Sequence, residues 1–286
     1  DNAHCVKILP FLGEYSWSVV IASLILTVCV AAVLIGGVKR IASVSQIVVP
    51  FMAILYFAFA IILIICNITE IPAAIKVIVT AAFTPKAVTG GAVGSMFVAM
   101  QKGVARGIFS NEAGLGSAPI AAAAAQTKEP VRQGLVSMTG TFIDTIVICT
   151  LTGLSIVLTG AWQVEGLEGV EVTTYAFQQG LPFPPAVSSF VLMLCLVFFA
   201  FTTILGWDYY SERCLEYLSG GNLKHVKVYR WIYIFAVFIG PYMTVSAVWT
   251  IADIFNGLMA LPNMIALFVL SGVVVRETKA FFKKQS

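Results

Sequence analysis

Long apolar runs separated by short polar stretches dominate the pattern of this 286-residue chain. Residues 16–38 and 45–66 contain no Asp, Glu, Lys or Arg. Each run is long enough to cross about 30 Å of hydrocarbon as a helix. Further predicted spans occupy 136–159, 186–206, 231–251 and 254–275. The pattern therefore predicts a bundle of transmembrane helices.

Two further segments complete this pattern. Residues 93–125 are long enough to span, but charge and glycine interrupt the run, so they predict a seventh span with a break at 110–117. Residues 71–83 are too short to span, and we expect a helix lying at the membrane edge. The fold class is therefore all-α integral membrane, with residues 1–286 forming a single transmembrane domain.

The composition excludes a water-soluble globule. Apolar residues make up 59% of the chain, charged residues 11%, and the mean hydropathy is +0.94. Soluble domains are about half apolar and about a quarter charged. The net charge of +3 and the lack of a basic run give no sign of nucleic-acid binding. Six cysteines without a CxxC pair and only two histidines suggest no metal centre, and no cofactor is expected.

Lysine and arginine gather in the segments that follow alternate spans, as the positive-inside rule expects for cytoplasmic loops. The opposite loop, 160–185, holds Glu165, Glu168 and Glu171 and no Lys or Arg. This asymmetry predicts a multi-pass protein of the cell (inner) membrane with its C-terminus in the cytoplasm. The cytoplasmic cations are Lys39, Arg40, Lys128, Arg132, Arg213, Lys224, Lys227, Arg230, Arg276, Lys279, Lys283 and Lys284.

The segment FSNEAGLGSAP, residues 109–119, carries the predicted break. Gly114 and Gly116 each weaken a helix interior by about 1 kcal/mol relative to Ala. Ser117 is a good N-cap, and Pro119 is tolerated in a first turn but not in mid-helix. We therefore expect one helix to end near residue 110 and another to begin near residue 118, with the alanine run that follows extending it.

Unwound backbone inside a bilayer must line a cavity or be buried in protein, because lipid satisfies no hydrogen bond. Discontinuous helices of this kind hold carboxylates and alkali ions in secondary transporters. The alternative is a packing kink, helped by the GxxxG pair Gly103 and Gly107. Glu112 favours a binding site, because a bare carboxylate at mid-depth costs about 2.5–3.5 kcal/mol and needs a partner or a task.

Other polar residues inside the spans are open to two interpretations. Asp144 should face the interior, in a functional or a structural role. Thr202 and Thr203 could offer oxygen ligands to a small cation, but mid-helix hydroxyls commonly bond their own i−4 carbonyls, and the sequence alone favours that. Asp208 is expected to pair with Arg213.

Two more side chains lie at functionally suggestive points. Trp207 could close a pocket with an apolar plane or belong to the interfacial aromatic belt. Asn263 follows Pro262 in the last span, and its amide is expected to restore hydrogen bonding around the proline kink.

The stretch 103–159, and above all its SNEAGLGSAPIAAAA run, closely resembles the alanine or glycine:cation symporter family. The segments 33–56, 199–218 and 256–276 carry the same likeness, which extends from about residue 19 to residue 276. The resemblance places the chain in the C-terminal two-thirds of such a protein.

The resemblance implies a leucine-transporter-like fold of two inverted five-helix repeats. The seven spans correspond to its fourth to tenth core helices, with 104–125 as the sixth. The GTGNIAG-like motif of the family's N-terminal third does not occur here, and the chain opens with Asp1, so we expect a fragment. The implied activity is sodium-coupled, or proton-coupled, symport of a small neutral amino acid, alanine or glycine, by alternating access.

The resemblance also implies the site residues. A Ser/Thr pair on the eighth helix of such folds contributes to a sodium site, and Thr202 and Thr203 match it. The break and Trp207 would hold the amino acid. The resulting substrate-binding candidates are Phe109, Ser110, Asn111, Glu112, Gly114, Gly116, Ser117 and Trp207.

Two alternatives to transport remain. The chain could be a non-transporting fragment or a membrane scaffold. A membrane-embedded enzyme is a distant third, because an aspartyl protease needs two carboxylates converging on one water, and Asp144 and Asp208 are expected at different depths.

Overall fold

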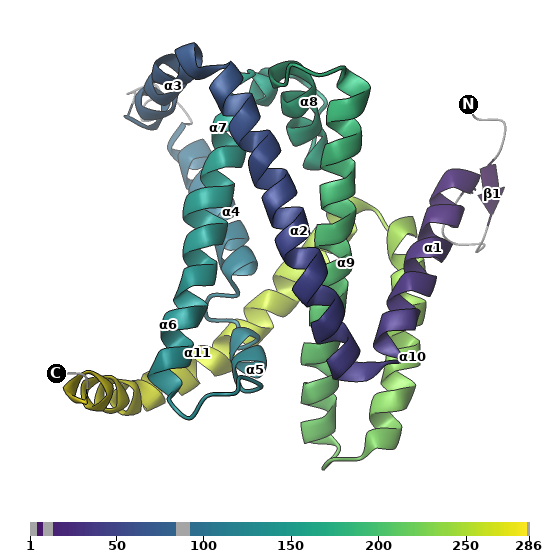
Figure 1. Cartoon of the computed structure of the whole chain (residues 1–286), viewed down its shortest axis with the longest axis vertical. Helices are drawn as coiled ribbons and strands as arrows, with labels where there is room; N and C mark the ends of the chain where they lie inside the picture. The colour runs from purple at the N-terminus through teal and green to yellow at the C-terminus, as the bar shows by residue number, and fades with distance from the viewer. Residues whose placement is uncertain (1–4, 8–13, 84–91, 285–286) are drawn as a thin grey trace. The chain divides into compact units, whose positions relative to one another are not determined.

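The computed structural model describes residues 5–7, 14–83 and 92–284, and this part of the chain is almost entirely helical (Figure 1). One small antiparallel strand pair, β1 (Cys5–Lys7) with β2 (Glu14–Ser16), precedes the helices. The helices are α1 (Trp17–Leu34), α2 (Gly37–Cys66), α3 (Ile71–Phe83), α4 (Ala92–Asn111), α5 (Ala118–Ala122), α6 (Pro130–Thr141), η4 (Phe142–Cys149), α7 (Thr150–Leu158), α8 (Val170–Gly180), α9 (Pro185–Leu218), α10 (Leu223–Ile239) and α11 (Val245–Lys283). Short 3-10 turns are η2 (Ile68–Glu70), η5 (Ala161–Gln163) and η6 (Gly240–Tyr242).

Five of the described helices are long and apolar enough to cross a membrane. They are α1, α2, the continuous rod formed by α6, η4 and α7, then α9 and α11. At most 22% of the most apolar window of each helix is buried within the chain. So much exposed apolar surface requires cover by lipid or other protein. A multi-pass helical membrane protein is therefore confirmed.

Two expected spans differ from the structure. The span 231–251 is wrong, because α10 ends at Ile239 and a 3-10 turn interrupts the run. Pro241 has no N–H to donate to a continuing helix, so the α-helical hydrogen-bond pattern stops here. The chain then runs as one helix, α11, through the whole of 254–275. The span 93–125 is divided between α4 and the five-residue α5.

The contacts between residues divide the chain into two compact units. Unit 1 comprises 1–52 and 196–255, and unit 2 comprises 53–195 and 256–286. In unit 1, α1 packs against α10, and the Ser23 hydroxyl donates to the Phe238 carbonyl at 2.8 Å. The buried side chains around this contact are Val30, Val33, Leu34, Ile41, Leu205 and Ile234.

In unit 2, side-chain contacts fasten α2 to α7 and α8. The Tyr56 ring stacks on Phe177 at 5.7 Å, and its hydroxyl shares a hydrogen bond with Thr152. Asn67 donates to the Leu63 carbonyl at 2.7 Å and to the Gly180 carbonyl at 2.9 Å, which ties the end of α2 to the end of α8. α3 follows at Ile71–Phe83, the range expected for the short helix, and packs against α7. Its place at the membrane edge stays a prediction.

Gly180→Ala is expected to destabilise unit 2. A Cβ at this position would lie 2.7 Å from Leu63 Cγ and 2.9 Å from Thr159 Cγ2, so the backbone or both side chains must shift. Overpacking of this kind costs about 1–3 kcal/mol. Thermal unfolding in detergent measures the loss. Gly153→Ala in α7 is the matched control, because its Cβ would meet nothing within 4 Å. Equal melting temperatures for the two variants would contradict the packing described here.

Candidate functional site

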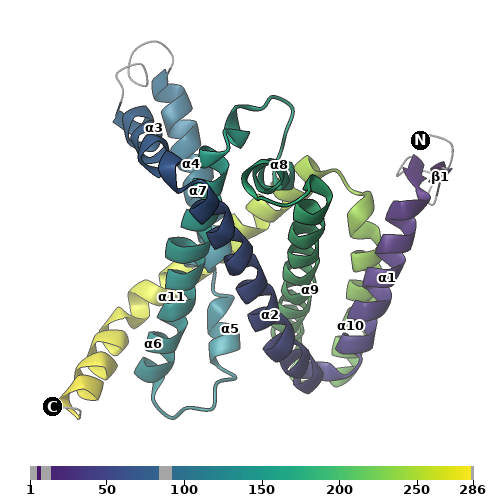
Figure 2. The same ribbon diagram turned by 45° about the horizontal axis from the view of Figure 1, so that its top comes forward.

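The break expected at 110–117 is present (Figure 2). α4 ends at Asn111, and α5 begins at Ala118 with Pro119 in its first turn. Glu112 has a φ of +51° and is the one described non-glycine residue with a positive φ. Gly114 and Gly116 follow at +75° and +83°. Left-handed geometry costs other residues about 1–2 kcal/mol, which explains the glycines and marks Glu112 as strained.

The expected extension of the second helix by the alanine run 121–125 is wrong, because α5 ends at Ala122. The helix propensity of alanine is only a weak preference. Over a run of five residues its favourable free energy is smaller than the free-energy cost of helix nucleation. Pro130 also holds Glu129 in an extended conformation, at φ −114° and ψ 107°, which favours non-helical chain after the alanines.

The last turn of α4 is bonded to η4. The Ser110 hydroxyl donates to the Asp144 carboxylate. The Asn111 amide donates to the Thr145 hydroxyl at 2.8 Å, and this hydroxyl donates back to Asn111 Oδ1 at 3.1 Å. Asp144 therefore has a hydrogen-bond partner, and two substrate candidates, Ser110 and Asn111, are engaged with protein.

The helix that supplies these partners is not α-helical. Residues Phe142–Cys149 form a π-helix between α6 and α7, so Asp144 and Thr145 both lie in the widened part of the rod. π-helical turns are rare in proteins as a whole, but those that occur are often found at functional sites. The β-branched, apolar sequence FIDTIVIC gave no signal for this geometry.

On its other side the break packs against α11. A Cβ added to Gly116 would lie 3.2 Å from the Asn263 side chain, and one added to Gly114 would lie 3.6 Å from Met264 Sδ. Leu115 is buried between these glycines. The Asn263 amide makes no hydrogen bond with any described residue, so the expectation that it repairs the proline kink is wrong. It lies against the break instead.

Several polar groups in the break remain unused. The Ser117 side chain is 1% exposed, and its hydroxyl has no hydrogen-bond partner among the described residues. The backbone N–H groups of Gly116 and Ser117 donate no hydrogen bond to any described residue. Buried polar groups without partners cost about 1–3 kcal/mol each, so such a cluster is suited to a polar ligand.

Thr202, Thr203 and Trp207 lie on α9 in unit 1. The Thr202 hydroxyl donates to the Phe198 carbonyl at 2.9 Å and lies 3.9 Å from Met52 Sδ. The Thr203 hydroxyl donates to the Phe199 carbonyl at 2.8 Å. Both hydroxyls thus make the i−4 bonds that the sequence alone favoured, and each oxygen keeps lone pairs for another partner.

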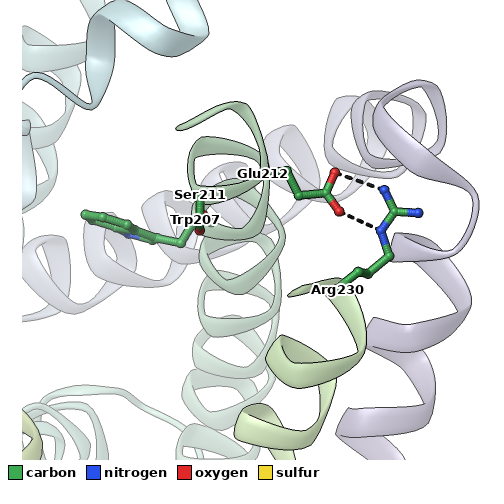
Figure 3. A network of polar contacts seen from close by, with 4 residues as sticks. All are labelled: Trp207, Ser211, Glu212 and Arg230. Carbon is green, nitrogen blue, oxygen red and sulfur yellow. Dashed lines mark hydrogen bonds and ion pairs between the residues drawn. The ribbon is translucent and has the colours of Figure 1, made fainter. Parts of the chain in front are cut away.

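The pairing expected between Asp208 and Arg213 is wrong. Arg213 Nη1 lies 2.5 Å from Glu216, while Asp208 is fully buried. Glu212, one turn after Asp208, makes a two-point ion pair with Arg230 of α10, with Nε at 2.5 Å and Nη2 at 2.9 Å. Figure 3 shows this pair on the side of α9 opposite the Trp207 ring. The Glu212–Arg230 pair was not among the contacts expected from the sequence. The available signal was the four-residue spacing of two acids, Asp208 and Glu212, in an apolar helix.

A family model described as the sodium:alanine symporter family matches residues 8–286. The chain belongs to this family. The family consists of symporters, so the enzyme interpretation is not supported, and sodium is the family's coupling ion.

Curated relatives of the chain agree with this assignment. An uncharacterised transporter of Haemophilus influenzae is 55% identical over 93% of this chain and 58% of its own length. The sodium/alanine symporter AgcS of Methanococcus maripaludis is 46% identical over 91% of this chain and 56% of its own length. The probable sodium/glutamine symporter GlnT of Bacillus subtilis is 37% identical over 97% of this chain and 56% of its own length. The chain thus spans 56–58% of these relatives, somewhat less than the two-thirds expected.

Gly116→Ala is expected to destabilise the break between α4 and α5 by about 1–2 kcal/mol through its backbone alone, with a further loss from the contact with Asn263. Gly114→Ala is the control, because it has a similar φ and only an ordinary contact with Met264. Adding Asn263→Ala removes the contacts with Cγ and Oδ1 but keeps Cβ, so it should recover part of the steric loss in Gly116→Ala and nothing in Gly114→Ala. Thermal unfolding of the four variants measures both parts, and identical recovery in the two backgrounds would refute the contact.

Proposed function

We propose that this chain carries the substrate-binding break and a coupling-ion site of a sodium-driven symporter of small neutral amino acids, alanine or glycine. The observation that carries the proposal is the break between α4 and α5, where three left-handed residues accompany a buried Ser117 hydroxyl and backbone N–H groups that are left unused in the described part of the chain. Membership of the sodium:alanine symporter family supports the same activity. The name of the relative AgcS favours alanine as the substrate.

In this proposal the amino acid is held by the break itself. The free N–H groups of Gly116 and Ser117, with the Ser117 hydroxyl, donate to its carboxylate, while carbonyls of 109–117 accept from its ammonium. Glu112 adds negative charge on the ammonium side. Phe109, at the end of α4, limits the volume available to the substrate side chain, which favours alanine and glycine over larger amino acids.

Asp144 acts in the proposal through the residues that it holds. Its carboxylate accepts from Ser110, and its neighbour Thr145 bonds Asn111, so the π-helix fixes where α4 stops. This arrangement makes Ser110 and Asn111 anchors of the break in the conformation described here. Either residue becomes available to substrate only when those bonds exchange during the transport cycle.

Sodium binds, on this proposal, at Thr202 and Thr203, whose hydroxyl oxygens retain lone pairs beside their helix bonds. Coupling requires that sodium and amino acid favour the same conformation differentially. The fold that accommodates this is the leucine-transporter-like inverted repeat, with seven spans here as its fourth to tenth core helices. The chain crosses the cell membrane with its C-terminus in the cytoplasm, as the distribution of lysine and arginine favours.

Sodium-driven uptake is the direct test. The complete transporter, reconstituted in liposomes, should accumulate radiolabelled alanine with an inward sodium gradient and not with an equal potassium gradient. Thr202→Ala and Thr203→Ala should raise the half-saturating sodium concentration about tenfold, the effect of losing one ligand oxygen to a charged group. Thr202→Ser and Thr203→Ser keep the oxygen and serve as controls. A reduced maximal rate with unchanged sodium dependence would mean that both hydroxyls bond only their own helix.

Ser117→Ala tests the amino-acid site. A hydrogen bond to a charged ligand contributes about 1.5–3 kcal/mol, so KM for alanine should rise about tenfold to a hundredfold with little change in kcat. Ser188→Ala in α9 is the matched control, since that hydroxyl is also fully buried and without a partner in the described chain, but lies outside the break. Equal KM values for the two variants would remove Ser117 from the site.

A further inference from the structure

A second buried group in the structure has no role in the mechanism above. Asp208 lies in α9 within unit 1 and is 0% exposed, and Glu212, one turn later, is 1% exposed. Neither carboxylate oxygen of Asp208 has a hydrogen-bond partner in the described part of the chain. An ionised carboxylate buried without a donor costs several kcal/mol, so this group requires compensation.

The donors around Asp208 are all bonded to other groups. Both bonding nitrogens of Arg230 are directed at Glu212 (Figure 3). The Tyr233 hydroxyl donates to the Ile204 carbonyl at 2.8 Å, and the Tyr229 hydroxyl bonds Ser211. These three residues of α10 and Glu212 of α9 are the titratable groups that face Asp208.

Within the described residues, the other elements next to Asp208 provide no cation. Around Leu205, three residues before Asp208, α1 and α2 contribute the apolar side chains of Val30, Leu34 and Ile41. The charged residues at the start of α2, Lys39 and Arg40, are exposed. Arg213 pairs with Glu216 and stands over the Tyr209 ring.

Two buried carboxylates therefore share one guanidinium, and one negative charge remains. A metal cation would need several oxygen ligands at once, and no group of three or more His, Cys, Asp or Glu side chains that could hold one occurs among the described residues. A proton needs only the carboxylate itself.

We propose that Asp208 is a proton-binding site of the transporter, carrying its proton in the conformation described here. The proton neutralises the uncompensated charge, and Arg230 remains paired with Glu212. When transport rearranges α9 and α10, exposure of Asp208 or approach of Arg230 releases the proton, so the transport rate becomes pH-dependent. The transport part of this inference rests on the proposed symport, whereas the protonated state of Asp208 does not.

Infrared difference spectroscopy tests the protonated state without transport. The spectrum of the purified protein minus that of Asp208→Asn should contain a protonated carboxyl C=O band that shifts in deuterium oxide. Asp253→Asn in α11 changes the same side chain at an exposed position and should give no such band. Absence of the band at Asp208 would overturn the proposal, whether or not the protein transports alanine.

The pH profile of sodium-driven alanine uptake tests the role of the proton. Asp208→Asn should lose the pH dependence of the wild type and keep its half-saturating sodium concentration, while Asp253→Asn should keep the wild-type profile. Asp208→Glu retains an acid at the position and should shift the midpoint of the profile, which provides the test if Asp208→Asn does not fold. A wild-type rate without pH dependence, an unshifted Asp208→Glu midpoint, or an Asp208→Asn variant altered only in its sodium requirement would each overturn the proposal. Failure of the wild type to accumulate alanine would instead overturn the proposed symport.

Discussion

The hydrocarbon core of a bilayer supplies no hydrogen bonds, and on the proposal that residues 93–125 cross it, this constraint governs the most unusual part of the chain. A helix that stops at Asn111 and resumes at Ala118 leaves peptide groups that lipid cannot satisfy. Protein or a polar ligand must therefore surround them. The structure provides protein on two sides, η4 at the end of α4 and α11 beside Gly116, and leaves Ser117 and nearby N–H groups unused.

The break is a defined conformation rather than a loosely coiled joint. Glu112, Gly114 and Gly116 all have positive φ, and the Asn263 side chain packs where a Cβ on Gly116 would lie. Strain at Glu112 persists because the flanking turn is held by the bonds of Ser110 and Asn111 to a π-helix. The π-helix and the break thus depend on each other, since each supplies polar partners that the other needs.

The sequence predicted those features that glycine, proline and long apolar runs determine locally. The break, its boundaries and the range 71–83 follow from such signals. The π-helix at Phe142–Cys149, the early end of α5 and the free carboxylate of Asp208 did not, because each depends on contacts between distant segments. Asp208 shows the limit clearly. Nearness in sequence favoured Arg213 as its partner, but packing gave Arg213 to Glu216 and left Asp208 facing α10.

The geometry of α9 separates its two kinds of polar residue. At about 100° per residue, Thr203 and Trp207 lie on nearly the same side of the helix, and so do Asp208 and Glu212, with the second pair rotated by about 140° from the first. The acidic side faces α10, where Arg230 binds Glu212. An ion bound at the threonines would therefore not touch Asp208. Any coupling between the two must pass through movement of α9 as a unit, which changes the surroundings of both sides together.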